Sequence, residues 1–203
     1  DSRKRSSPAP PLRLSLPPVQ FEPGTIGLTI SGTGGTWLIA RCVYHSDGYG
    51  TFLAGQRIAS SGELLDAAPV MLMDWTYGQL DVMAVGGEYL VVGPDWNSSA
   101  QKARRISANL QPIAPAFNLP VNFVSIGASS TGYFVTWIAN FTDLVGSPMS
   151  TSGVLLNPSG TLLYPSYSGE SGVAHDGTNW WVLRSVSNEA RLVRVSSGGT
   201  RLD

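Results

Sequence analysis

Hydrophobic and polar positions alternate in short runs along the chain, and turns rich in glycine separate the runs. Leu12, Leu14 and Leu16 alternate with polar residues, which is the period of a half-buried strand. The longer apolar runs at residues 89–92 and 180–183 are typical of strands that are covered on both faces. The pattern predicts an all-β fold of many short strands joined by tight turns.

A unit of four strands recurs along the chain. Each copy has an apolar strand, a turn, an aromatic strand, a third strand and a tight turn before a short apolar segment. The aromatic strands carry Trp37, Tyr89, Tyr133 and Trp180. Such self-similarity is the mark of repeat architecture, and radial stacking of four-stranded sheets buries their faces and protects their edges. The sequence therefore predicts a β-propeller of about four four-stranded antiparallel blades.

The domain organisation follows from the same pattern. Residues 1–11 are rich in Ser, Pro and basic side chains and predict a flexible or extended tail. Residues 12–203 predict a single propeller domain with repeat units at approximately 25–73, 80–119, 120–168 and 169–203 plus 12–16. Within these units we expect an outer strand from Leu64 onward in the first and a third strand over residues 154–156 in the third.

The fourth unit is short of one outer strand, and residues 12–16 could supply it. In one interpretation this strand pairs with the last strand of the same chain and closes a ring. In the other, the chain is a stretch of a longer propeller, or half of one that a second copy completes. The candidate closure or assembly residues are Leu12, Leu14, Leu16, Leu192, Val193 and Val195.

Two motifs carry a resemblance to known repeats. One is the run Asp176-Gly177-Thr178-Asn179-Trp180-Trp181-Val182, and the other runs from Arg194-Val195-Ser196 to Leu202-Asp203, with a further copy from Arg57 to Asp66. They resemble the β-propeller repeats of large bacterial secreted proteins. The resemblance implies a propeller fold and an extracellular or cell-surface setting, and it carries no catalytic residue. Residues 175–180 are more weakly similar to the Asp-box of sialidases, which is itself a structural turn.

Composition and charge exclude several classes of function. The net charge is -1 and the pI is about 6.1, so we expect no nucleic acid partner, because binding to phosphates needs clustered Lys and Arg. No stretch of 18 apolar residues occurs, so no membrane span is expected. The single cysteine, Cys42, cannot form an internal disulfide and is expected to be a small buried side chain.

Candidates for catalysis are few. His45, His175 and Cys42 form no cluster with metal-ligand spacing, so we expect no metal and no cofactor. His175 beside Asp176 and near Ser171 suggests a catalytic triad, but neighbours on a strand point to opposite faces. Asp176 is better explained as the first residue of an Asp-Gly turn. We expect that the protein is not an enzyme.

Loop aromatics are the strongest ligand-binding candidates. Tyr49, Trp75, Tyr77 and Trp96 fall in predicted loops or strand ends, and rigid rings give a large contact area at a small entropic cost. Asn97 and Asn140 fit the N-glycosylation pattern, which is relevant for a eukaryotic source. The first hypothesis is a non-enzymatic scaffold or interaction module of an exported or cell-surface protein, binding other chains or copies of itself. The alternatives are a lectin-like, glycan-binding propeller and, less favoured, a glycosidase.

Overall fold

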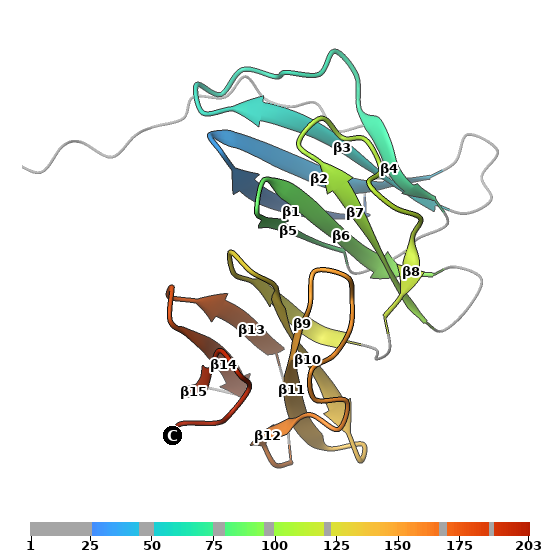
Figure 1. Ribbon diagram of the computed structural model, residues 1–203. Coiled ribbons are helices and arrows are strands. Elements are labelled where there is room, and N and C mark those ends of the chain that lie inside the picture. Colours follow the sequence, from blue (N-terminus) through green and yellow to red (C-terminus); the bar gives the residue numbers. More distant parts are fainter. Residues whose placement is uncertain are drawn as a thin grey trace, which may run out of the picture.

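Four antiparallel sheets follow one another along the chain in the computed structural model (Figure 1). The structure describes residues 26–44, 51–74, 80–95, 100–119, 123–166, 170–186 and 189–203. Every regular element within these ranges is a β-strand. In each sheet the strands pair in chain order, so each sheet is a simple meander.

The first two sheets each hold four strands. The first consists of β1 (Ile26–Thr33), β2 (Thr36–Tyr44), β3 (Thr51–Ala59) and β4 (Val70–Asp74). The second consists of β5 (Asp81–Val85), β6 (Glu88–Pro94), β7 (Gln101–Ser107) and the short β8 (Phe117–Asn118).

The last two sheets differ in strand number among the described residues. The third consists of β9 (Phe123–Ala128), β10 (Tyr133–Ala139), β11 (Asp143–Met149) and β12 (Thr161–Tyr164). The fourth has only β13 (Glu170–His175), β14 (Asn179–Val186) and β15 (Glu189–Ser196). We call the first strand of each sheet inner and the fourth outer, so the fourth sheet has no outer strand in the described part of the chain.

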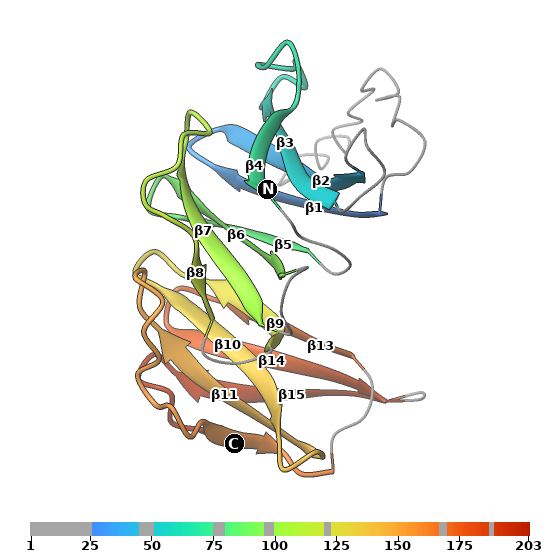
Figure 2. The same cartoon turned by 90° about the vertical axis from the view of Figure 1, so that its right-hand side faces the viewer.

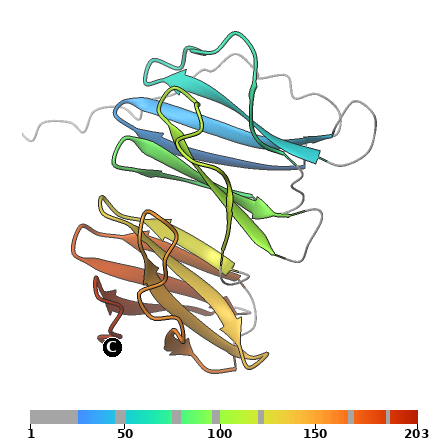
Figure 3. The ribbon, with the colours of Figure 1, turned by 45° about the vertical axis from the view of Figure 1, so that its right-hand side comes forward.

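The inner strands gather side by side. Strand β1 contacts β5, β5 contacts β9, and β9 contacts β13, so the sheets fan out from a common line (Figure 2). No contact of comparable extent joins β1 to β13 within the described residues. The four sheets therefore form an open arc, with the first and fourth sheets at its two ends (Figure 3).

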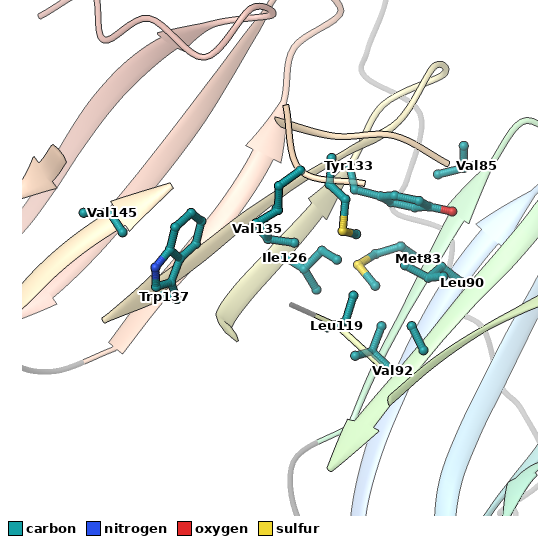
Figure 4. Close-up of a cluster of buried hydrophobic side chains, with 13 residues drawn as sticks. Met83, Val85, Leu90, Val92, Leu119, Ile126, Tyr133, Val135, Trp137 and Val145 are labelled. Carbon is teal, nitrogen blue, oxygen red and sulfur yellow. The ribbon is translucent and has the colours of Figure 1, made fainter. Parts of the chain in front are cut away.

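Three hydrophobic clusters fill the spaces between neighbouring sheets. Between the second and third sheets, Met83, Leu90 and Val92 face Ile126 and Tyr133 (Figure 4). The other two clusters lie between the first and second sheets and between the third and fourth. Because these interfaces bury both faces of the second and third sheets, the alternation of their strands gives way to nearly continuous burial in β6 and β10.

Tight turns join the inner strand of a sheet to the second one. In the first sheet the turn residues Gly34 and Gly35 have φ of 58° and 81°, the left-handed values that a type I′ hairpin requires at both central positions. The β10–β11 turn uses the same conformation at Asn140 and Phe141, with φ of 49° and 66°. Phe141 is a bulky residue at a position that favours glycine, and its side chain is fully exposed.

Two strand assignments from the sequence are wrong. The third strand of the third unit is β11, not residues 154–156, where Leu155 makes only an isolated bridge to Met149. Local preference does not predict β11, because this strand contains Gly146 and Pro148, residues that are depleted in strands. Likewise Leu64 makes an isolated bridge, and the outer strand of the first sheet begins at Val70.

Candidate functional site

The four marker aromatics occupy equivalent positions. Each lies on the second strand of its sheet and pairs with a residue of the third strand. That third-strand residue also forms an isolated bridge to a residue just after the turn that follows the third strand. The four sets are Trp37, Ile58 and Leu64; Tyr89, Ile106 and Pro112; Tyr133, Met149 and Leu155; and Trp180, Val195 and Arg201. This common register allows any residue of one sheet to be compared with its counterpart in the others.

One face of each sheet turns toward the preceding sheet, and at the start of the arc this face is open. Tyr89, Tyr133 and Trp180 are at most 3% exposed, whereas Trp37 is 47% exposed. The inner strands show the same difference, because Ile30 is 57% exposed while its counterpart Ile126 is 5% exposed. Two apolar side chains at blade-facing positions of the first sheet, Ile30 and Trp37, are thus uncovered.

The opposite face turns toward the following sheet, and at the end of the arc it is open too. On β14 and β15, Leu183 and Leu192 face each other across the strands and are 39% and 59% exposed. The residues at the position of Leu183 in the other sheets, Ala40, Val92 and Thr136, are fully buried. Leu192 stands where the other sheets have Gly55, Ala103 and Gly146.

The open face of the first sheet is hollowed. The hollow is lined by Ile39, Arg41, Ala54, Gly55, Gln56, Leu64 and Pro69. The register pairs Ile39 with Ile30 and with Gln56, and Arg41 with Ala54, so these side chains lie on the same face as Trp37. The hollow is therefore part of the uncovered surface at the start of the arc.

The open face of the fourth sheet carries charge around Trp181. The indole Nε1 donates a hydrogen bond to Asp176 Oδ2 at 2.7 Å, and the Arg194 guanidinium lies 5.8 Å from the centre of a Trp181 ring. Backbone N–H groups of Asn179 and Thr178 also donate to Asp176. Together these hydrogen bonds lower the pKa of Asp176 to about 2, because they favour the ionised carboxylate.

An arginine and aspartate pair holds the turn after the third strand in the first and fourth sheets. Asp66 accepts hydrogen bonds from the Arg57 side chain and from its backbone N–H, and Asp203 accepts one from the backbone N–H of Arg194. The side-chain hydrogen bonds from Arg57 hold the pKa of Asp66 below its ordinary value. Arg57 also donates to Asn109 in the second sheet at 3.0 Å, so this pair links two sheets.

The structure does not bring a catalytic triad together at Ser171. The Ser171 hydroxyl lies 2.9 Å from that of Ser125 on β9. The His175 Nδ1 accepts a hydrogen bond from the Gly177 N–H, and its ring packs against Trp180. Asp176 begins the turn, as the Asp-Gly pair predicts. Cys42 is buried, again as expected.

Among the described residues, no group of three or more His, Cys, Asp or Glu could hold a metal ion. Two acidic residues near strand ends have other partners. Asp95 pairs with Lys102 at 2.8 Å, and Asp143 accepts a hydrogen bond from the Ser166 N–H. None of the described residues form a helix that could cross a membrane.

Many of the residues proposed from the sequence lie outside the described ranges. They are Tyr49, Trp75, Tyr77 and Trp96 of the ligand-binding set, Leu12, Leu14 and Leu16 of the closure set, and the glycosylation candidate Asn97. Leu192 is exposed on the open face of the fourth sheet, whereas Val193 and Val195 are buried against the third sheet. Asn140 lies in the exposed β10–β11 turn.

Sequence reasoning missed Ile30, Trp37 and Leu183 as surface residues, because it assigned apolar strand positions to the core. The order of the repeats along the chain could have indicated which apolar positions are exposed. In an arc, the first copy of a marker has no preceding neighbour and the last copy has no following one.

Comparison with known proteins yields the fold and no sequence family. No family model and no curated protein matches the chain. Among solved structures, a GH43_1 enzyme from Xanthomonas citri is similar over 88% of this chain and 72% of its own, with 10% identity and a TM-score of 0.57. The RS223 β-xylosidase is similar over 88% of this chain and 73% of its own, with 8% identity and a TM-score of 0.54.

These structures define the class of the fold. The similar glycoside hydrolases are five-bladed β-propellers, and the likeness confirms the all-β propeller fold expected from the repeats. The chain spans 64% of another similar structure, the α-L-arabinofuranosidase PaAbf62A from Podospora anserina. At 8–10% identity the likeness to the first two shows the fold alone.

Proposed function

We propose that this protein is a non-enzymatic β-propeller interaction module, and that the two open sheet faces at the ends of its arc are docking surfaces for further β-sheets, including those of a second copy. The observation that carries the proposal is the exposure of blade-facing apolar residues at both ends. Such positions on the middle sheets are buried by a neighbouring sheet. Apolar residues at the same positions of the end sheets fit a partner that is also a β-sheet.

The energetic argument is the cost of leaving these faces in water. Full burial of an Ile or Leu side chain stabilises an interface by roughly 1.5–3 kcal/mol. Four apolar side chains are partly exposed and therefore lack part of this stabilisation. They are Ile30 and Trp37 on one face and Leu183 and Leu192 on the other. Large apolar patches on a soluble protein usually mark interaction sites. Two such faces on one chain support association of the end of one copy with the start of another.

Sedimentation of the purified chain over a range of concentrations tests this proposal. We expect assembly that weakens on dilution. In Leu192→Asp and Ile30→Asp the dissociation constant should rise at least about tenfold, since loss of roughly 1.4 kcal/mol of binding free energy has that effect. The matched control is Leu156→Asp, because Leu156 is 64% exposed but lies in the segment between β11 and β12, outside the first and fourth sheets.

Two results would count against the module. A chain that stays monomeric up to about 0.1 mM, where even weak dimers are visible, would remove self-association. Equal effects of Leu156→Asp and Leu192→Asp would show that the open faces are not the contact.

A panel of glycosides and a glycan array test the alternatives. The similar structures include a β-xylosidase, so hydrolysis of xylosides is the first activity to assay. Glycan binding that disappears in Trp75→Ala and Trp96→Ala would replace the interaction module with the lectin-like alternative. Hydrolysis by the purified chain would overturn the non-enzymatic proposal.

A further inference from the structure

Leu192 stands at a position that is glycine in the first and third sheets. In the common register, this position of the third strand is Gly55 in the first sheet and Gly146 in the third. A Cβ on Gly55 would lie 2.5 Å from the Leu72 side chain, and one on Gly146 would lie 2.9 Å from that of Leu163. Leu72 and Leu163 are buried residues of the outer strands β4 and β12. The glycines therefore leave room for a leucine of the outer strand.

The fourth sheet has no outer strand among the described residues, and Leu192 takes the place of such a leucine. Its side chain starts where a Cβ on Gly146 would start, and it extends from the open face toward the space that Leu163 occupies on the third sheet. It is 59% exposed. The fourth sheet thus presents a leucine at the point where the first and third sheets present one from their outer strands.

The outer-strand leucines pack toward the next sheet along the chain. Leu72 belongs to the same hydrophobic cluster as Val91, and its carbonyl oxygen accepts a hydrogen bond from Arg104 at 3.1 Å. Leu163 belongs to the same cluster as Val182. Val91 and Val182 occupy one position of the second strand, two residues after the marker aromatic. Each leucine thus shares a cluster with the same position of the following sheet.

The first sheet leaves the equivalent position open. Ile39 stands at the position of Val91 and Val182, and Gln56 stands at that of Arg104. Both Ile39 and Gln56 line the hollow on the open face of the first sheet. The hollow therefore lies where a preceding sheet would place its leucine.

We propose that Leu192 of one copy inserts into the hollow on the first sheet of a second copy, between Ile39 and Gln56. The hollow is also lined by Leu64 and Pro69, and these apolar walls suit a leucine because burial of apolar surface drives association. This inference rests on the proposed function, and it adds the residue that anchors the contact and the site that receives it. The contact is heterologous, because the two copies contribute different faces.

A second copy supplies the leucine because the first and fourth sheets lie at opposite ends of the arc (Figure 3). Within the described residues, no strand of the first sheet contacts a strand of the fourth to the extent that neighbouring sheets contact each other. Leu192 therefore does not reach the hollow on the first sheet of its own molecule.

Disulfide trapping between two variants tests the contact. In a Cys42→Ala background, Leu192→Cys and Gln56→Cys are purified separately, mixed and oxidised. A bond between the two variants should form faster than a bond between two molecules of the same variant, because a disulfide requires Cβ atoms about 3.5–4.5 Å apart. The matched control replaces the first variant with Leu156→Cys, at another exposed leucine, and should stay mostly reduced. Peptide mass mapping identifies the bonded residues.

Two results of the trapping experiment would overturn the inference. Bonds that form mainly between two Leu192→Cys molecules would show that the fourth-sheet faces of two copies meet each other. Equal trapping of Leu156→Cys would show that the bonds report random collisions and not a specific contact.

Charge complementation supplies a second measurement that needs no cross-link. Leu192→Glu should raise the Kd of assembly at least about tenfold, because it places a carboxylate in an apolar hollow. A mixture of Leu192→Glu with Gln56→Arg should regain most of that affinity, since an arginine then faces the carboxylate, whereas a mixture with Gln56→Glu should not. The second sheet already carries Arg104 at this position, so the strand accommodates an arginine there. Equal Kd values for the two mixtures would contradict the inference.

Sedimentation of the unmodified chain alongside these variants separates the inference from the proposed function. If the unmodified chain stays monomeric, self-association fails and the inference fails with it. If the chain assembles and Ile30→Asp weakens the assembly, but trapping and complementation both fail, then the open faces associate without insertion of Leu192 into the hollow.

Discussion

The middle and end sheets of the arc share one repeat register but are packed against different numbers of neighbouring sheets. The second and third sheets are covered on both faces, whereas the first and fourth are each covered on one. Even so, the uncovered positions keep apolar residues, such as Ile30 and Leu192. Each copy of the repeat therefore carries apolar residues on both faces of its sheet. The position of the copy in the arc decides whether a neighbouring sheet covers these faces within the described residues.

The largest expected difference is between two isoleucines at one register position. Ile126→Ala should cost about 2–4 kcal/mol, because it opens a cavity between two sheets. Ile30→Ala should cost less than about 1 kcal/mol in the monomer, since the side chain is mostly in water. Urea denaturation of both variants at low protein concentration measures the pair. Equal losses of unfolding free energy would show that the first sheet is covered in the monomer.

The next difference concerns the position that is Gly146 in the third sheet and Leu192 in the fourth. A Cβ at Gly146 would lie 2.5 Å from Phe134 and 2.9 Å from Leu163, so Gly146→Ala should cost about 1–3 kcal/mol through overpacking. Leu192→Ala should be nearly neutral in the monomer. Urea denaturation curves of the two variants measure both losses of unfolding free energy. A neutral Gly146→Ala would mean that the Phe134 and Leu163 side chains can move away from β11.

The repeats made the fold predictable, and the deviations from them are instructive. Trp37, Tyr89, Tyr133 and Trp180 are sufficient to define four sheets, because a large aromatic that recurs at one position of the repeat is a strong signal. Strand β11 was not predictable from local preference. Gly146 lies there because a side chain would meet Phe134 and Leu163, a tertiary cause that overrides the low strand propensity of glycine.

The candidate surface was harder to predict than the fold. An apolar residue at a strand position predicts burial. Nothing in the sequence around Ile30 or Leu183 indicates that no neighbouring sheet covers it among the described residues. Equally, the hollow beside Ile39 and Arg41 depends on how β2 packs with its neighbouring strand and the following turn, which no single strand encodes. The site depends on positions in space that no local pattern encodes.

The smallest expected difference is between the two arginine and aspartate pairs. The Arg57 and Asp66 side chains are 21% and 12% exposed at a separation of 2.6 Å, and the Arg194 and Asp203 side chains are 42% and 49% exposed at 3.5 Å. Asp66→Asn should therefore cost about 1–2 kcal/mol at neutral pH, as expected for a partly buried charged hydrogen bond. Asp203→Asn should cost at most about 0.5 kcal/mol, as for a solvated ion pair.

The pH dependence of stability sharpens this last comparison. The folded-state pKa of Asp66 is lower than its ordinary value of 3.8 because Arg57 donates hydrogen bonds to the carboxylate. Ionised Asp66 therefore stabilises the fold above that ordinary value, and the contribution is lost as the pH falls toward the folded-state pKa. Unfolding free energies between pH 7 and about pH 2 should show a steeper acid decline in the unmodified chain than in Asp66→Asn. An identical acid decline in the two proteins would mean that the ion pair between Arg57 and Asp66 does not stabilise the fold. It would also mean that this pair does not support the contact of Arg57 with the second sheet.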